Sequence, residues 1–282
     1  MTKIISGKDL AKELKLNIKE ELNVLYQNNR NAKLSVILVG EDPASQSYVK
    51  GKSKACCEVG IINETILLPA DITEEALLQK IDELNHDDSV DGILVQLPLP
   101  KHINESRVIE AVDVLKDVDG FHSRNVASLF QHKNCIIPCT PKGIIKLIEK
   151  AGISIEGKNA VVIGRSQIVG LPVAKLLLDK NATVTIAHSR TKDLRSVTKH
   201  ADILVVAVGR PKMIDKSYCK HNQCVIDVGV NRVDGKLCGD CDFDSLNGYV
   251  KVLTKVPGGV GPMTIACLME NTLELYKKHL GL

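Results

Sequence analysis

Short apolar runs alternate with segments of helical periodicity along most of this chain of 282 residues. The apolar runs predict strands at 34–39, 66–68, 92–97, 160–163, 183–187, 203–208 and 224–228. The periodic segments predict helices at 6–25, 43–60, 74–84, 106–112, 140–152, 171–178, 193–199 and 264–279. Strands that alternate with helices form parallel sheets, because each helix carries the chain back to begin the next strand in the same direction. The sequence therefore predicts an α/β fold.

Two domains are expected from the length and from a break in this alternation. At roughly 100 to 200 residues per domain, 282 residues correspond to about two. Residues 113–138 are rich in Asp, Gly, His, Ser and Asn, which is typical of a loop that lines a cleft or joins domains. We place one domain at 1–138, rejoined by the C-terminal helix within 264–282, and the second at 139–263.

Composition excludes several classes of protein. Aromatic residues make up 3% of the chain and Trp is absent, which argues against a protein that stacks single-stranded nucleic acid. A mixed net charge of +3 implies no polyanionic partner, and the apolar runs are far shorter than the roughly 18 residues of a membrane span. Nine cysteines, an odd number in a large chain with no recognisable secretory signal, indicate reduced thiols and a cytoplasmic protein.

The segment Val161–Pro172 has the pattern of a nucleotide-binding turn. An apolar strand runs through Gly164 into a helix, so backbone N–H groups at the helix start can face a pyrophosphate. Ser166 stands where the second glycine of G-x-G-x-x-G is expected, so a tight turn without a ligand remains an alternative. The next strand ends in His188–Thr191 without the acid that holds an NAD ribose, which favours NADP; a solvated basic turn is the other reading.

A second group of candidate residues precedes this turn. Tyr48 and Lys52 share one helix face, where a lysine can move protons, although a surface helix with scattered lysines is the simpler reading. Gln96 ends an apolar strand, the place where open α/β sheets bind ligands. Asp117 and Asp119 alternate, so we expect only one to face a given pocket, or both to bond within the turn.

Two further motifs have ambiguous signals. The loop 256–264, with Gly258, Gly259 and Val260, can lay bare backbone against a flat ligand or act as a hinge. Cys238-Gly239-Asp240-Cys241 is half of a zinc motif with no second half, so no metal site is expected.

Taken in this order, the motifs resemble the bifunctional methylenetetrahydrofolate dehydrogenase/cyclohydrolase family over nearly the whole chain. Each motif is weak alone, and together they are specific. They are Y-x-x-x-K at 48–52, V-Q-L-P-L-P at 95–100, K-D-V-D-G-F at 116–121, P-C-T-P-x-G at 138–143, G-R-S-x-I-V-G-x-P at 164–172 and P-G-G-V-G-P-M-T at 257–264.

The resemblance implies an N-terminal catalytic domain, a Rossmann-like NADP-binding domain and an active-site cleft between them. It implies oxidation of 5,10-methylenetetrahydrofolate with NADP and hydrolysis of the methenyl product to 10-formyltetrahydrofolate, within one-carbon metabolism and purine biosynthesis. It also implies a homodimer. A non-catalytic nucleotide sensor and a dehydrogenase of another small substrate are the rival readings.

The resemblance also assigns residues. Lys52 assists proton transfer, Gln96 hydrogen-bonds Lys52, Tyr48 stacks on the folate rings, and Asp119 binds the amide and amino edge of the pterin. The residues that border the folate are Gly258, Gly259 and Val260, and those that meet the cofactor are Gly164, Arg165, Ser166, Ser189 and Val230.

Overall fold

The computed structural model describes all residues from Met1 to Leu282 and divides into two compact units. The six-strand unit comprises Met1–Lys12 and Pro138–Thr264, and the three-strand unit comprises Glu13–Ile137 and Ile265–Leu282. Two helices, α1 (Gly7–Leu25) and α10 (Val260–His279), contribute residues to both units. No helix is long and apolar enough to cross a membrane.

The six-strand unit is built on one parallel sheet in the order β1-β11-β8-β7-β5-β6. Its strands are β1 (Lys3–Ile5), β5 (Asn159–Ile163), β6 (Thr183–Ala187), β7 (Ile203–Val206), β8 (Cys224–Asp227) and β11 (Val252–Thr254). Its helices are α6 (Cys139–Lys150), α7 (Gly170–Asp179), α8 (Leu194–His200) and the short α9 (Phe243–Leu246), with a 3-10 turn at Lys216–Tyr218. Because β5 has β6 on one side and β7 on the other, the strand order reverses beside β5, as in Rossmann-like sheets.

The N-terminal strand of this sheet differs from the sequence-based boundaries, which assign all of 1–138 to one domain. Lys3 lies opposite Val252 in parallel register, so β1 forms the sheet edge beside β11. The Thr2 hydroxyl donates to the Val250 carbonyl at 2.6 Å. These contacts place Met1–Lys12 with the six-strand unit. A strand of three residues carries too little periodicity to be recognised in the sequence.

The three-strand unit has a parallel sheet in the order β3-β2-β4. Its elements are β2 (Lys33–Val39), α2 (Pro43–Val59), β3 (Ile62–Leu68), α3 (Glu74–Asn85), β4 (Gly92–Val95), α4 (Glu105–Ala111) and α5 (Ser123–Phe130). Helix α2 begins and ends as the sequence predicts. The Asp42 side chain accepts a hydrogen bond from Ser45 N–H, and Gly60 ends the helix with a φ of 90°.

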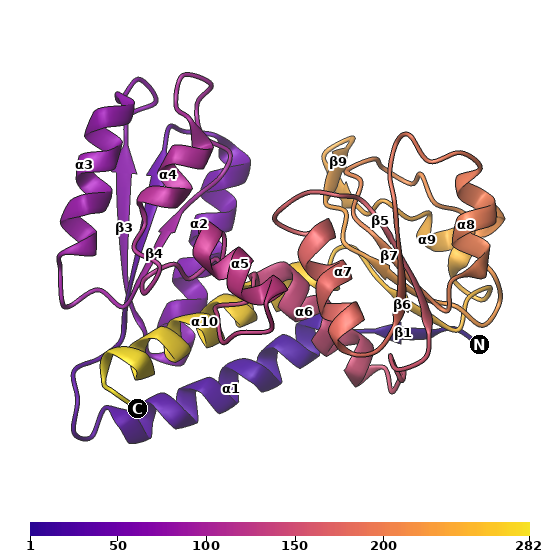
Figure 1. Cartoon of the computed structure of the whole chain (residues 1–282), viewed down its shortest axis with the longest axis horizontal. Helices are drawn as coiled ribbons and strands as arrows, with labels where there is room; N and C mark the ends of the chain where they lie inside the picture. Colours follow the sequence, from indigo (N-terminus) through magenta and orange to yellow (C-terminus); the bar gives the residue numbers. More distant parts are fainter. The chain divides into compact units, whose positions relative to one another are not determined.

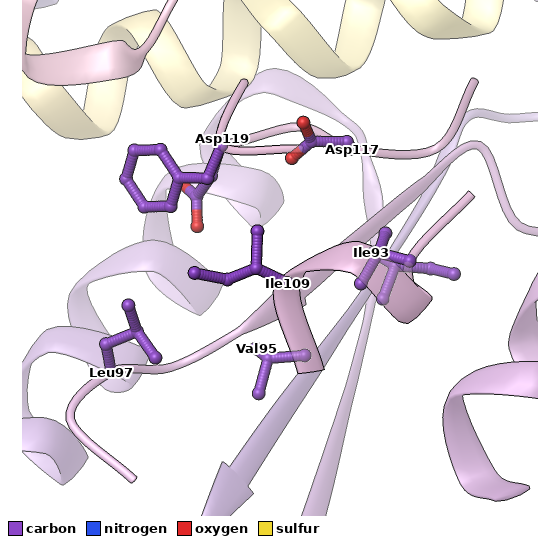
Figure 2. A pocket seen from close by; sticks show the side chains of 8 residues that line it. Ile93, Val95, Leu97, Ile109, Asp117 and Asp119 are labelled. Atoms are coloured by element: carbon purple, nitrogen blue, oxygen red, sulfur yellow. The ribbon is translucent and has the colours of Figure 1, made fainter. Parts of the chain in front are cut away.

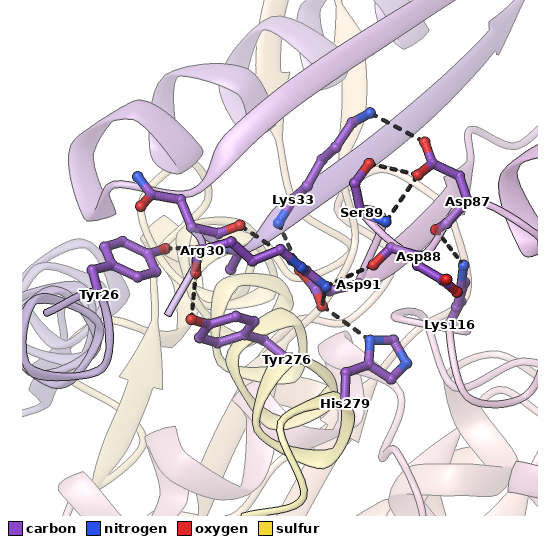
Figure 3. A network of polar contacts seen from close by, with 12 residues as sticks. Tyr26, Arg30, Lys33, Asp87, Asp88, Ser89, Asp91, Lys116, Tyr276 and His279 are labelled. Carbon is purple, nitrogen blue, oxygen red and sulfur yellow. Dashed lines mark hydrogen bonds and ion pairs between the residues drawn. The ribbon is translucent and has the colours of Figure 1, made fainter. Parts of the chain in front are cut away.

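The C-terminal helix returns to the three-strand unit, as the sequence predicts. Its last turns run beside α1, and an ion pair joins Lys277 to Glu21 (Figure 1). At the end of α10, His279 Nδ1 lies 2.9 Å from the fully buried carboxylate of Asp91, and Arg30 binds the same carboxylate through two bonds of 2.7 Å (Figure 3). The Tyr276 hydroxyl donates to the Arg30 carbonyl. Polar contacts therefore bind the last turn of α10 to residues that precede β2 and β4.

Several elements were not predicted. Helix α5 lies within the segment expected to be a loop, and β9 (Asn231–Val233) pairs with β10 (Lys236–Cys238) as an antiparallel hairpin. Both are short, so few residues carry the hydrophobic period of each element. Strand β11 is also only three residues long. Fold class and element order otherwise agree with the prediction.

Candidate active site

Lys52 and Gln96 meet in the three-strand unit. Lys52 lies in the middle of α2, and Gln96 follows the last residue of β4, where its backbone N–H donates to the Ile37 carbonyl at 2.9 Å. The Lys52 ammonium donates to Gln96 Oε1 at 2.9 Å. Gln96 Nε2 donates to the Leu97 carbonyl at 2.6 Å, which leaves the side-chain oxygen for the lysine. The amide therefore holds the half-buried ammonium from one side.

Tyr48 lies one helical turn before Lys52 on the same face of α2. The inner side of this helix is formed by Ser45, Val49, Ala55, Cys56 and Val59, which are buried. Tyr48 keeps 43% of its surface exposed. Its ring therefore offers a flat apolar face on the same helix as the lysine, the arrangement that stacking on a planar ligand requires.

Asp119 lies over a small hollow lined mainly by apolar side chains. The lining comprises Ile93, Val95, Leu97, Ile109, Val112, Asp117, Asp119 and Phe121. Figure 2 shows the Asp119 carboxylate directed toward Ile109, while Asp117 on the same loop points elsewhere. The hollow measures about 20 Å³, room for about one water molecule.

The surroundings of Asp119 change its acidity. Burial raises the pKa of Asp119 to about 6; the nearby charge of Asp117 adds to this rise and the Lys52 ammonium opposes it. Lys52 is therefore close enough to act on the carboxylate electrostatically. The structure brings Lys52, Gln96 and Asp119 together from the middle of α2, the end of β4 and the loop after α4.

Asp117 has a different role from Asp119. Its carboxylate accepts hydrogen bonds from Gly120 N–H at 3.0 Å, His122 N–H at 2.9 Å and Asn125 Nδ2 at 2.9 Å. Both acids contribute to the lining of the hollow, but their carboxylates point in different directions, and that of Asp117 is bound within the turn (Figure 2). The alternate spacing in the sequence does not reveal which acid holds the turn.

In the six-strand unit, the candidate cofactor residues gather at one edge of the sheet. Because the strands are parallel, their carboxyl ends lie at the same edge. Gly164–Ser166 follow β5, Ser189 lies just after β6, Val230 lies after β8, and Gly258–Val260 come after β11. Ser189 and Val230 are exposed there.

The turn after β5 requires glycine and leaves backbone donors unused. Gly164 has a φ of +129°, and a Cβ on it would lie 2.3 Å from the Ala207 carbonyl oxygen. The Ser166 hydroxyl accepts hydrogen bonds from the N–H groups of Val169 and Gly170, each at 3.2 Å. The N–H groups of residues 165–168 make no hydrogen bond within the chain. Such a row of exposed donors before a helix fits a phosphate group.

The turn after β6 carries positive and neutral polar groups only. Thr191 Oγ1 accepts from His188 N–H at 2.8 Å, and Arg190 N–H donates to His188 Nδ1 at 3.1 Å. These bonds fold the turn so that Ser189 and Arg190 are exposed. No acid lies among residues 188–192, and the acid that follows, Asp193, accepts a hydrogen bond from Ser196 N–H as the cap of α8.

Close backbone packing requires a residue without a side chain in the loop after β11 and at the start of α1. A Cβ on Gly259 would lie 2.8 Å from the Lys255 carbonyl oxygen, and a Cβ on Gly7 would lie 1.8 Å from the Gly259 carbonyl oxygen. Lys8 N–H donates to the Gly258 carbonyl at 3.1 Å. The loop therefore packs closely on the start of α1, which explains the two glycines whether or not a ligand lies beside them.

Two buried carboxylates behind this edge were missed in the sequence. Asp240 accepts from the N–H groups of residues 208–210 and from Asn231 Nδ2. Asp227 accepts from the N–H groups of Gly229, Asp240 and Cys241, and burial raises the pKa of Asp227 to about 6. Both acids fix loops at the carboxyl edge. Cys238 and Cys241 are free thiols, and no group of three or more potential metal ligands lies in the chain.

Two family models identify the class of protein to which this chain belongs. The chain is an α/β enzyme with a nucleotide-binding unit: residues 138–280 match the family model "Tetrahydrofolate dehydrogenase/cyclohydrolase, NAD(P)-binding domain", and residues 5–119 match the model of the catalytic domain of that family. The chain belongs to the tetrahydrofolate dehydrogenase/cyclohydrolase family.

Individual relatives agree over the full length. The chain is 53% identical over 276 residues to a bifunctional protein FolD of Bacillus cytotoxicus, covering 98% of this chain and 96% of the relative. The crystal structure of FolD from Campylobacter jejuni is 46% identical, covers 99% of both chains and has a TM-score of 0.97. The Trypanosoma brucei enzyme, solved with NADP and an inhibitor, is 37% identical, covers 100% of this chain and 99% of its own, and has a TM-score of 0.96.

Proposed function

We propose that this chain oxidises 5,10-methylenetetrahydrofolate with NADP and hydrolyses the methenyl product to 10-formyltetrahydrofolate. The observation that carries this proposal is the contact between Lys52 and Gln96, with Asp119 within electrostatic reach, in a chain of this family. The first reaction moves a hydride from the methylene carbon to the cofactor. The second adds water to the resulting cation and breaks one carbon–nitrogen bond of the ring.

Lys52 is the residue we assign to proton transfer in the second reaction. Water that adds to the methenyl carbon must lose a proton, and the departing ring nitrogen must gain one. An amine held by the Gln96 oxygen at 2.9 Å has a fixed direction and can pass a proton at this position. Tyr48, on the same helix, would stack on the folate rings and hold the one-carbon unit near the amine.

Asp119 is the residue we assign to recognition of the pterin. Its carboxylate would accept hydrogen bonds from the amide and amino N–H groups of the ring, which are charge-assisted only while the acid is ionised. The apolar lining of the hollow strengthens such bonds by excluding water.

This assignment predicts the pH dependence of folate binding. Burial raises the pKa of Asp119 to about 6, so protonation removes the acceptor as the pH falls through this value. We expect the KM for methylenetetrahydrofolate to rise by about tenfold per pH unit below pH 6, with the KM for NADP unchanged. Initial rates measured from pH 5 to pH 8 provide the test. A folate KM that stays constant across this range would contradict the role of Asp119.

The six-strand unit fits NADP. The unused N–H groups of 165–168 would bind the pyrophosphate, and Arg165 with Ser189 and Arg190 would meet the 2′-phosphate. Val230 would border the cofactor, and Gly258, Gly259 and Val260 would border the folate. When bound, the nicotinamide accepts the hydride. The protein orients both partners and manages the protons.

The Ser189→Asp substitution tests the 2′-phosphate site. A carboxylate at this exposed turn would oppose the phosphate, and we expect NADP to bind about tenfold more weakly while NAD binding changes little. Ser196→Asp, which adds the same charge at an exposed position of α8, is the matched control. Calorimetric titration with each nucleotide gives the result. Equal NADP affinities of the Ser189→Asp variant and the parent would remove Ser189 from the site.

A spectrophotometric assay tests the proposed function itself. Purified protein with methylenetetrahydrofolate and NADP should produce absorbance of the methenyl compound and of the reduced cofactor, and the methenyl band should then decay by hydrolysis. A nucleotide sensor would bind NADP without either change. A dehydrogenase of another substrate would reduce NADP only when that substrate is supplied.

We also propose that the protein is a homodimer of the cytoplasm. All nine cysteines are free thiols, which fits a reducing compartment. Light scattering after size-exclusion chromatography should give twice the chain mass of 30.7 kDa. The formyl product would supply formyl-transfer reactions such as those of purine biosynthesis.

A further inference from the structure

We propose that Asp117 is a positioning residue for Asp119: its carboxylate holds the turn 117–122 in the shape that presents Asp119 to the pterin. This inference rests on the proposed function and assigns a role to a residue that does not itself touch the substrate. Three N–H donors converge on the Asp117 carboxylate, from Gly120, His122 and Asn125, at 2.9 to 3.0 Å. These donors come from the residue directly after Asp119 and from the segment that follows it.

The residues on both sides of Asp119 are also fixed. The Lys116 carbonyl accepts from Ile93 N–H at 2.7 Å, so the segment extends the sheet beside β4. The buried Lys116 ammonium donates to the carbonyls of Leu84 and Asp87 at 3.0 and 2.8 Å. Together with the Asp117 bonds, these contacts hold the backbone before and after Asp119.

A further contact comes from the far end of the chain. Asn271 of α10 is fully buried, and its Nδ2 donates to the carbonyls of Val118 and Ile137, both at 2.9 Å. The residue between Asp117 and Asp119 is therefore bound to a helix that lies about 150 positions later in the sequence. Hydrogen bonds therefore hold the backbone on both sides of Asp119, and the Asp119 side chain projects from this fixed segment.

The position of Asp117 also has an electrostatic consequence. Its negative charge adds to the rise in the pKa of Asp119 that burial causes, while the Lys52 ammonium of α2 opposes the rise. Removing the charge of Asp117 should therefore lower the pKa of Asp119. A residue that only stabilised the fold would not change this titration, so the effect separates positioning from stability.

The test is Asp117→Asn in the full-length enzyme. An asparagine offers one oxygen where three donors now converge, and its NH₂ group would face at least one N–H. We expect the KM for methylenetetrahydrofolate to rise about tenfold, the acid limb of its pH profile to move to lower pH, and the KM for NADP to stay at the parental value. Asp113→Asn, which removes the same charge from a nearby exposed turn, is the matched control and should leave all three unchanged.

A second variant and a second readout complete the experiment. If Asp117→Asn does not fold, Asn125→Ala removes one of the three donors and should raise the folate KM about threefold. The carboxyl ¹³C signal of Asp119, titrated in the parent and in the variant, reports its pKa without any turnover. A parent that does not oxidise the folate would refute the proposed function. A folded Asp117→Asn variant with parental folate KM and an unchanged Asp119 titration would overturn the positioning role. Failing that variant, parental folate KM in Asn125→Ala would overturn it, because this variant keeps the Asp117 charge and is judged by KM alone.

Discussion

The Lys52→Met variant should lose cyclohydrolase activity by about 10² to 10⁴-fold, the range that a positioned proton-transfer group contributes. Methionine keeps the length and apolar stem of lysine but cannot exchange a proton or donate to Gln96 Oε1. NADP affinity should remain at the parental value, because the six-strand unit carries the candidate cofactor residues. The decay of added methenyltetrahydrofolate at its absorption band measures the loss directly.

The choice of pH and control makes this result specific. Lys52 opposes the rise in the pKa of Asp119, so its removal should raise that pKa further and weaken folate binding near neutral pH. Measurement near pH 8 with saturating folate separates lost chemistry from lost binding. Lys54→Met changes an exposed lysine on the same helix and should keep full activity. A Lys52→Met enzyme that hydrolyses the methenyl compound at a near-parental rate would refute the assigned role.

The Asp91→Asn variant should lower the free energy of unfolding by about 3 kcal/mol or more, because it removes one partner from a buried ion pair. The Asp91 carboxylate is fully buried and accepts from Arg30 twice, from Lys33 N–H and from His279 Nδ1. The variant leaves the Arg30 charge without its counterion. Because the Arg30 side chain is itself 37% exposed, water can solvate part of that charge, which keeps the expected cost near the lower end of the usual range.

The same network predicts a loss of stability in acid. Burial alone would raise the pKa of Asp91, but hydrogen bonds from His279 and Arg30 outweigh it and hold the pKa below its ordinary value. A lowered pKa adds stability above the unfolded-state pKa of about 3.9, and this contribution is lost as the pH falls from there through the folded-state value.

Chemical denaturation of the parent and variant gives the measurement. At pH 7 the Asp91→Asn variant should unfold at a clearly lower denaturant concentration than the parent. This difference in midpoint should shrink below about pH 4. Glu58→Gln breaks the exposed ion pair with Lys15 and should cost less than about 1 kcal/mol. Equal midpoints for Asp91→Asn and the parent would show that the network does not stabilise the three-strand unit.

Local signals explain which parts of the fold could be predicted. Asp42, Pro43 and Gly60 mark both ends of α2 through the chemistry of neighbouring residues, so a short window of sequence is enough. Strand β1 pairs with β11 across nearly the whole chain, and three residues at each site carry no recognisable period. Helix α5 begins at Ser123 and is capped by His122, whose Nδ1 accepts from Arg124 N–H. Sequence rules do not favour histidine as a capping residue.

In the candidate site too, some residues have a local sequence signal and others do not. The spacing of Tyr48 and Lys52 follows from helix geometry, and the family motifs point to Gln96 and Asp119. The roles of these residues stay predictions until they are tested. Asn271 was not predicted, because it reaches Val118 only in the folded chain. Long-range hydrogen bonds of buried polar groups have no local sequence signal, so the residues that shape the Asp119 turn had to come from the structure.

Each of the two units is completed by contacts with residues late in the sequence. The edge of the larger sheet joins residues 3–5 to residues 252–254, and the smaller unit closes on residues near 276–279. On the ribosome, therefore, the larger unit lacks its edge pairing until residue 254 has been made, and the smaller unit lacks its last contacts until residue 279 has been made. Nascent chains that stall before residue 252 should remain open to proteases in both halves, whereas a stop between residues 265 and 276 should harm the smaller unit.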